Sequence, residues 1–130
     1  MKVRVVSRGL WTLYAVCTDR GDCPLLEFLA DTTSSHLAKT KRQMLRRLEM
    51  IAQTGVVRVT EISHQIAEDI WQIEKGDIRI LYFYDKGRVI LLSHGFVKET
   101  QKTRPAEIQR AQEALRRYRA ERHELKIIED

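Results

Sequence analysis

The stretch DIWQIEKGDIRILYFYDKGRVILLSHGFV, from Asp69 to Val97, decides the fold. It holds three short apolar runs, which are separated by Lys-Gly-Asp and Asp-Lys-Gly. Both separators are typical of tight hairpin turns, because glycine accepts the positive φ that such turns require. We therefore expect three consecutive antiparallel strands near residues 69–75, 78–84 and 88–97.

Strand-forming residues also precede this meander. The segment WTLYAVC, Trp11–Cys17, is rich in aromatic and β-favouring residues and predicts a strand of the same sheet. Residues Val3–Val6 are either another strand or part of the same strand, bent at Gly9. The chain thus contributes about four strands to one sheet.

Three helices are expected around that sheet. Pro24 opens a short helix, since proline suits the first helical turn. A longer helix, capped by Ser34 or Ser35, runs to Gln53 and ends at Gly55. Its apolar residues recur at helical spacing: Leu37, Met44, Leu48 and Ile51. The third helix begins at Pro105 and shows the same periodicity. The order β-α-α-β-β-β-α predicts an α+β protein with an antiparallel sheet, two helices in the N-terminal half and one C-terminal helix.

Length and hydropathy indicate one cytoplasmic domain. The chain has 130 residues, 43% of them hydrophobic, which suffices for a single core. We expect one domain over residues 1–130, with a core at about 11–120 and a charged tail at 121–130, either frayed or ordered by a partner. No apolar run reaches 18 residues, and the N-terminus is too short and too charged for a signal peptide.

Charge favours an acidic or polyanionic partner, because the formal charge is +5 and the pI is near 9.4. Several cations lie mostly off the apolar side of the long helix: Lys39, Arg42, Arg46 and Arg47. They form either a solvated helix face or a surface that follows a nucleic-acid backbone. Cys17 and Cys23 are expected to be free thiols, and no metal site or cofactor is expected.

The most informative cationic stretch is SHGFVKETQKTRP, Ser93–Pro105, which follows the last strand. Alternation in that strand puts His94, Phe96 and Lys98 on one face. Arg79 lies in the neighbouring strand, so it can cluster with His94, Lys98 and Lys102. Such a cluster would bind phosphate, with arginine as a bidentate fork and lysine as a point charge.

A phosphate site of this kind could cut RNA. Metal-free cleavage needs a base, an acid and a cation for the charge on phosphorus. His94 could take either proton role, and crowded cations would make Lys98 or Lys102 a better proton donor. Tyr82 or Tyr84 could stack on a base.

The same residues have simpler structural interpretations. The lysines after the strand could form only a solvated loop, and His94 could be structural. Arg79 could merely balance Glu74 or Asp85.

A longer segment, VILLSHGFVKETQKTRPAEIQRA, resembles the end of HigB-like toxins, the phage-derived branch of the RelE superfamily. In that branch a strand ends in phenylalanine and lysine, followed by a Thr-Gln-Lys-Thr-Pro run and a helix. Arg104 here stands between Thr103 and Pro105. The residues that match are Phe96, Lys98, Thr100, Gln101, Lys102, Thr103 and Glu107.

The resemblance extends over about residues 11–120. Trp71 and the segment 79–81 are similar to the paired strands of these toxins, and PLLEFL fits their first helix. It implies a small RelE-like fold and the toxin of a type II toxin–antitoxin pair. Such toxins cut mRNA on the ribosome without metal and are silenced by a HigA-like helix-turn-helix antitoxin. The resemblance implies that the toxin associates with DNA only through the antitoxin and does not associate with a membrane.

Two departures from the family pattern bear on activity. The branch usually has an acid, an apolar residue and an arginine after the tryptophan, whereas this chain has Gln72, Ile73 and Glu74. Glu99 replaces a frequent basic residue, and an acid can offset a nearby cation. The alternatives are a non-catalytic RNA- or antitoxin-binding module and an interaction protein of phage origin with no RNA role. The site residues that we predict are Arg79, His94 and Lys98 for catalysis and Lys102, Arg104, Tyr82 and Tyr84 for RNA.

Overall fold

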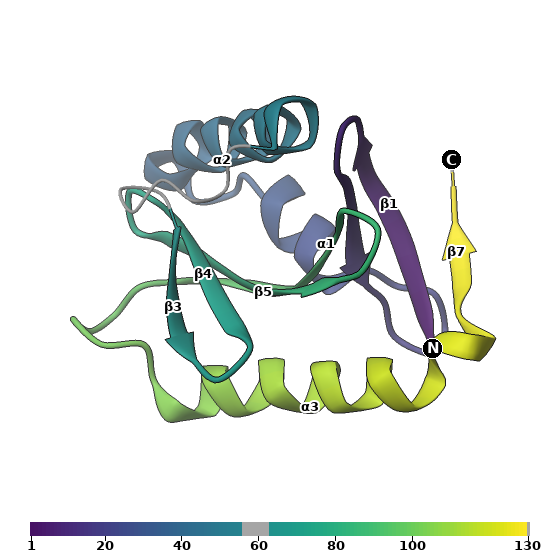
Figure 1. The fold of residues 1–130 in the computed structure, drawn as a ribbon. Coiled ribbons are helices and arrows are strands. Elements are labelled where there is room, and N and C mark those ends of the chain that lie inside the picture. Colours follow the sequence, from purple (N-terminus) through teal and green to yellow (C-terminus); the bar gives the residue numbers. More distant parts are fainter. Residues whose placement is uncertain (56–62, 130) are drawn as a thin grey trace.

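A seven-stranded mixed sheet runs through the protein, for which a computed structural model describes residues 1–55 and 63–129 (Figure 1). The strand order is β3-β4-β5-β6-β2-β1-β7. The strands are β1 (Lys2–Arg8), β2 (Thr12–Val16), β3 (Ser63–Ala67), β4 (Ile70–Lys75), β5 (Ile78–Asp85), β6 (Val89–Val97) and β7 (Lys126–Ile128). The helices are α1 (Pro24–Ala30), α2 (Ser35–Thr54), α3 (Pro105–Glu121) and the 3-10 turn η1 (Arg122–Glu124).

The predicted meander is confirmed. Strands β4, β5 and β6 are consecutive and antiparallel, and β2 joins the same sheet by pairing in parallel with β6. The α+β class is also confirmed, and the helices begin where proline predicted, with Pro24 and Pro105 in their first turns. Gly55 ends α2 in the left-handed conformation, with φ of 69°. Ser34 is the N-cap of α2, although its side chain makes no capping hydrogen bond.

The expected antiparallel sheet of about four strands was wrong, since seven strands form within the described residues and two pairings, β2 with β6 and β1 with β7, are parallel. β1 is a separate strand that pairs antiparallel with β2. β3 lies at one edge and pairs with β4 although it carries little apolar sequence. The tail was expected to be frayed or ordered by a partner, but its residues Lys126–Ile128 form β7 in parallel with β1 (Figure 1). Short edge strands lack the alternation that reveals longer ones, because partner hydrogen bonds rather than side chains hold them.

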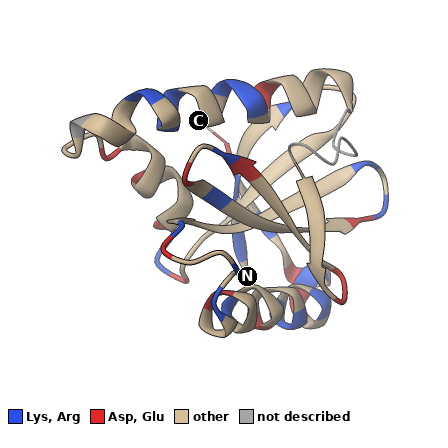
Figure 2. Cartoon of the chain, turned by 90° about the vertical axis from the view of Figure 1, so that its left-hand side faces the viewer, with Lys and Arg blue, Asp and Glu red and all other residues tan. Residues whose placement is uncertain are grey.

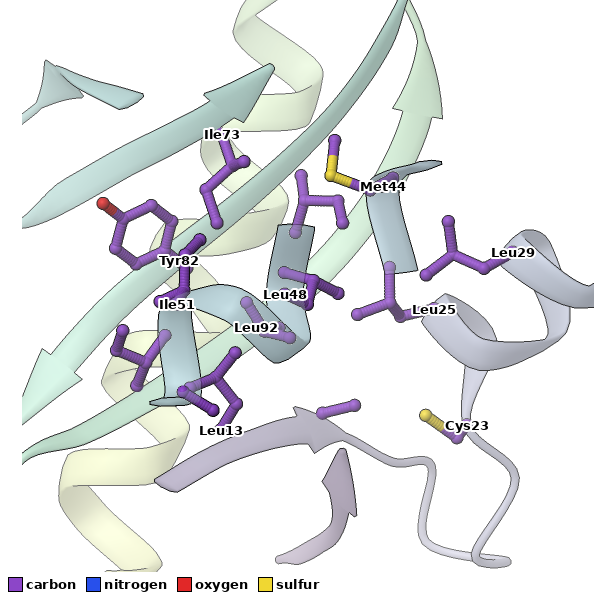
Figure 3. Close-up of a cluster of buried hydrophobic side chains, with 14 of the residues drawn as sticks. Leu13, Cys23, Leu25, Leu29, Met44, Leu48, Ile51, Ile73, Tyr82 and Leu92 are labelled. Carbon is purple, nitrogen blue, oxygen red and sulfur yellow. The ribbon is translucent and has the colours of Figure 1, made fainter. Parts of the chain in front are cut away.

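Two apolar cores lie on the two faces of the sheet. The first core packs α1 and α2 against one face and includes Leu25, Met44 and Leu48 (Figure 3). The second core packs α3 against the other face, through Ala111 and Tyr118. Because both faces are covered, β5 is mostly apolar on both sides, and its sequence contains one continuous run of apolar and aromatic residues. None of the helices in the described ranges is long and apolar enough to span a membrane.

A β-bulge in β6 determines which face its second half presents. Leu92 lies opposite Tyr82, whereas His94 lies opposite Leu81, so Ser93 is the extra residue. Leu92 and Tyr82 belong to the first core and Leu81 to the second. The bulge therefore turns His94 toward α3, although simple alternation from Leu92 would direct it toward α1 and α2.

Gly95, directly after the bulge, lets α1 approach the sheet. A Cβ at this position would lie 2.9 Å from Cδ2 of Phe28 and 3.0 Å from Cδ1 of Leu25. These contacts are too short for a methyl group, and Leu25 is fully buried. Glycine here thus sets the distance between α1 and β6.

We predict that Gly95→Ala destabilises the protein by about 1–3 kcal/mol, the usual cost of overpacking a filled core. Urea unfolding followed by circular dichroism measures it. Gln112→Ala, at an exposed position of α3, is the control and should stay within about 0.5 kcal/mol. Equal stability of Gly95→Ala and wild type would show that α1 does not pack as described.

Candidate functional site

A hollow of about 370 Å³ lies where β6 extends beyond β2 and enters the loop of residues 98–104. The hollow is open to solvent and receives side chains from both halves of the chain. Its lining residues are Phe28, Gln72, Arg79, Gly95, Phe96, Val97, Lys98, Glu99, Thr100, Gln101, Lys102, Thr103, Arg104 and Glu107. The cationic stretch that the sequence singled out thus forms most of its wall.

Arg79 is the one cation of the hollow that comes from the middle of the sheet. The strand register sets it opposite Glu74 on β4 and opposite Phe96 on β6. Its Nη1 donates hydrogen bonds to the carbonyl oxygens of Gly76, at 2.6 Å, and Ile78, at 3.1 Å. Its side chain is only 11% exposed, so the guanidinium is fixed in place and its accessible part faces the hollow.

Glu74 holds Arg79 from the other side. The carboxylate Oε1 lies 3.5 Å from Nε of Arg79 and 3.8 Å from Nε2 of His64 on β3. The same oxygen accepts a hydrogen bond from Nε2 of Gln72 at 3.0 Å. The sequence left open whether Arg79 balances Glu74 or Asp85. The partner is Glu74, while Asp85 accepts from Tyr118 at 2.5 Å at the other end of β5.

Gln72 anchors the cationic loop to the sheet. Its side chain is buried, and its Oε1 accepts a hydrogen bond from Oγ1 of Thr103 at 2.5 Å. Lys98 fixes the start of the loop, since its backbone N–H donates to the carbonyl oxygen of Asp77 at 2.7 Å. Gln72 and Glu74 therefore form one connected network that runs from Arg79 to the loop.

The loop places its cations differently. Lys98 is partly buried, and Lys102 is exposed at the boundary with a second hollow of about 320 Å³. Arg104 is exposed and forms an ion pair with Glu99. Lys98 and Lys102 thus join Arg79 at the hollow, whereas the charge of Arg104 is offset by its acid neighbour.

His94 lies outside the wall of the hollow. It is 1% exposed, and it contacts Oγ of Ser93 at 2.9 Å through Nδ1 and Oε1 of Glu107 at 3.2 Å through Nε2. Burial, helped by the charge of Arg110, lowers the pKa of His94 to about 4. The imidazole is therefore neutral at pH 7, with Nε2–H donating to Glu107 and the Ser93 hydroxyl donating to Nδ1. In this structure His94 joins β6 to α3.

The two predicted base-stacking tyrosines are not in the hollow. Tyr82 is fully buried in the first core, and its hydroxyl is 2.5 Å from that of Ser63 (Figure 3). Tyr84 lies farther along β5, where its ring packs edge-on against Trp11 and Trp71, both at 5.8 Å between centroids. Strand parity puts both tyrosines on the face that α1 and α2 cover, opposite to the side chain of Arg79.

Several polar residues of this site did not enter the predicted site, among them Gln72, Glu74, Thr103 and His64. The parity of β4 contained a usable signal, because Gln72 and Glu74 alternate with the apolar Ile73 and so share a face. The link from Thr103 to Gln72 spans 31 residues and left no local signal. In residues 1–55 and 63–129, no group of three or more His, Cys, Asp or Glu side chains is arranged to hold a metal ion.

Comparison with known families defines the class of the chain as RelE toxin-like. Residues 34–116, more than half of the chain, match the family described as Phage derived protein Gp49-like (DUF891), and the chain belongs to this family. The matched region begins at the N-cap of α2 and ends within α3, so it includes β4, β5, β6 and the cationic loop. A search of curated proteins found no match.

The buried His94 predicts a pH dependence of stability. The unfolded chain takes up a proton on this histidine below about pH 6.5, whereas the folded chain does so only below about 4. Stability is therefore full above pH 6.5 and falls as the pH drops toward 4, by about 2 kcal/mol at pH 5. Urea unfolding should show that wild type loses about 2 kcal/mol more stability than His94→Gln between pH 7.5 and pH 5. The same pH difference in both proteins would contradict the assignment.

The contact between Thr103 and Gln72 predicts how the loop is held. Thr103→Val keeps the shape but leaves Oε1 of buried Gln72 without its donor, at a cost of about 1–3 kcal/mol. Amide hydrogen exchange should speed up across residues 98–104. Thr103→Ser retains the hydroxyl and should exchange like wild type. Unchanged exchange in the valine variant would mean that the loop is held elsewhere.

Proposed function

We propose that the chain is a HigB-like toxin that cuts mRNA on the ribosome, with the hollow as its active site and no metal ion in the reaction. The observation that carries the proposal is the fixed Arg79 guanidinium, which faces the hollow beside Lys98 and Lys102 and has the Glu74 carboxylate 3.5 Å from its Nε. A fixed cation next to a carboxylate supplies two of the three groups that RNA cleavage through the 2′-hydroxyl requires, the base and the charge stabilisation, and Lys98 offers the acid.

Phosphate binding is the first part of this function. Arg79 binds the scissile phosphate, and because the backbone carbonyls already orient its guanidinium, little reorganisation is needed when charge develops. Lys102, exposed on the rim, contacts the flanking backbone. Arg104 contributes less charge here, because Glu99 is its ion-pair partner.

Proton transfer is the second part. Glu74 accepts the proton of the 2′-hydroxyl, and the freed oxygen attacks phosphorus. The bond from phosphorus to the 5′-oxygen breaks, and the Lys98 ammonium gives that oxygen its proton. The products are a 2′,3′-cyclic phosphate and a 5′-hydroxyl, and solvent returns the proton from Glu74 to Lys98. His94 transfers no proton in this scheme. It has a positioning role, because its contact with Glu107 joins β6 to α3.

Two partners follow from this function. A HigA-like helix-turn-helix antitoxin would silence the toxin and connect it to DNA, and the ribosome would present the mRNA. The formal charge of +5 supports association with RNA, and membership of a RelE toxin-like family supports the toxin–antitoxin context.

A second candidate function is a non-catalytic RNA- or antitoxin-binding module. The ion pair between Glu74 and Arg79 favours it, because an acid this close also offsets the charge offered to a phosphate. The two candidates assign opposite roles to Glu74, as a base or as a neutralising partner. Removal of its charge therefore distinguishes them.

We predict that Arg79→Ala lowers mRNA cleavage by about two to three orders of magnitude, as expected for the loss of a transition-state charge contact. Cleavage is measured on translating ribosomes with purified protein. Glu74→Gln should lower cleavage by about a hundredfold, because the base is lost while the side chain keeps its size. Arg116→Gln, on the exposed surface of α3, is the control and should cut like wild type.

Three outcomes would contradict this function. A rise in cleavage in Glu74→Gln would make Glu74 a neutralising partner, not a base. Equal cleavage by wild type and Arg79→Ala would show that the hollow is not the active site. Absence of cleavage in every protein, with growth unaffected on induced expression, would favour the non-catalytic module.

A further inference from the structure

Most of the net positive charge of the chain lies on one helix. α2 carries five cations and one acid, which gives +4 of the +5 of the whole chain. The cations are Lys39, Lys41, Arg42, Arg46 and Arg47, and the acid is Glu49. Like charges this close along one helix repel one another and do not favour its folding. We therefore look for a binding role for these cations.

Two of these cations are used within the protein. Lys41 is buried, donates from Nζ to the carbonyl oxygen of Asp31 at 2.6 Å and lies 4.4 Å from the ring centroid of Phe28. Arg47 donates from Nη1 to the carbonyl oxygen of Glu74 at 2.5 Å. Both contacts hold α2 against the elements that build the hollow.

The other three cations point outward. Lys39, Arg42 and Arg46 are exposed and follow one another at i, i+3 and i+7, which puts them along one side of the helix over about 10 Å. We call these three residues the outer stripe. Within residues 1–55 and 63–129, none of them has an ion-pair partner.

The arginines of α3 are treated differently. Three of its four arginines are paired with acids: Arg116 with Glu113, Arg117 with Asp19 and Glu121, and Arg119 with Asp69. Arg122, just beyond the helix, is paired with Asp85, and the fourth arginine of α3, Arg110, is exposed and not among the paired ones. Figure 2 shows the contrast, with Lys and Arg along α2 on one side of the sheet and both signs mixed along α3 on the other. The protein thus neutralises one side and leaves the other positive.

We propose that the outer stripe binds the sugar–phosphate backbone of RNA. Two of its three members are arginines, which grip phosphate oxygens bidentately. The stripe has no aromatic residue, and Met50, one turn beyond Arg46, is the exposed large apolar residue of α2. A protein partner would need buried anchors that this face does not offer, whereas an RNA backbone needs charge alone.

Helix α2, which carries the outer stripe, contacts the turn between β4 and β5 at the hollow. A Cβ at Gly76 would lie 3.1 Å from Cγ2 of Thr40, and the carbonyl oxygen of Gly76 accepts from Arg79. The same turn therefore touches both α2 and the cation of the hollow. RNA bound in the hollow can continue along the outer stripe, which would supply affinity without reading sequence. This surface goes beyond the proposed cleavage, because it binds RNA whether or not the hollow cuts it.

The test compares two double variants of equal net charge. Arg42→Gln/Arg46→Gln removes two members of the outer stripe, and Arg116→Gln/Arg119→Gln removes two paired arginines of α3. The probe is a fluorescent single-stranded RNA oligonucleotide, whose anisotropy gives the affinity at several salt concentrations. Loss of two phosphate contacts should reduce the slope of log K against log salt by about 1.4 for the α2 variant, and at low salt its affinity should fall at least about tenfold. The α3 variant should keep the slope of wild type.

Three results would overturn the proposal. The α2 variant could keep the wild-type slope, both variants could lose affinity equally so that net charge alone acts, or wild type could fail to bind the RNA. Arg79→Ala separates this outcome from that of the proposed cleavage. If that variant cuts like wild type while the α2 variant loses its slope, the hollow is not the active site but the outer stripe still binds RNA.

Discussion

The register of β5 between its two neighbours is the constraint on which the site depends. It sets Arg79 opposite Glu74 on one side and Phe96 on the other. A slip by one residue would exchange the two faces of β5 and bury Arg79 beneath α2. Alternate side chains of β5 fill both cores, so such a slip would also disrupt Tyr82 and Phe83. The packing of the centre of the sheet thus fixes the position of the cation.

Gln72 and Glu74, where the resemblance to HigB-like toxins led us to expect an acid and an arginine, help to build the site. Gln72 anchors the loop through Thr103, and Glu74 joins Gln72 to Arg79. An arginine at position 74 would add a cation beside Arg79 but would also face it across the strand pair, where like charges destabilise. This chain has instead a connected polar network beside Arg79. Whether the carboxylate then serves as a base or only as a partner is the chemical question that the structure poses.

Much of the architecture was predictable because its signals are local. Turn residues between apolar runs gave the meander, and proline and glycine gave the helix boundaries. The strand β7 was missed because it pairs with β1, far along the chain, and β3 was missed because it carries little apolar sequence. For the candidate site, the sequence grouped Arg79, His94, Lys98 and Lys102, of which Arg79, Lys98 and Lys102 line one hollow and His94 does not. It gave no account of the bulge at Ser93 or of the burial of His94 against Glu107, because both depend on the packing of α3.

The central claim is that Arg79 and Glu74 promote attack of the 2′-hydroxyl on the adjacent phosphate. The chemical ends of the cut mRNA test it most directly. Cleavage on translating ribosomes by wild type should leave a 2′,3′-cyclic phosphate upstream and a 5′-hydroxyl downstream, as identified by mass spectrometry and by labelling with a kinase that needs a free 5′-hydroxyl. These ends should become rare with Arg79→Ala. A 5′-phosphate at the cut would contradict the account, because water and not the 2′-hydroxyl would then be the nucleophile.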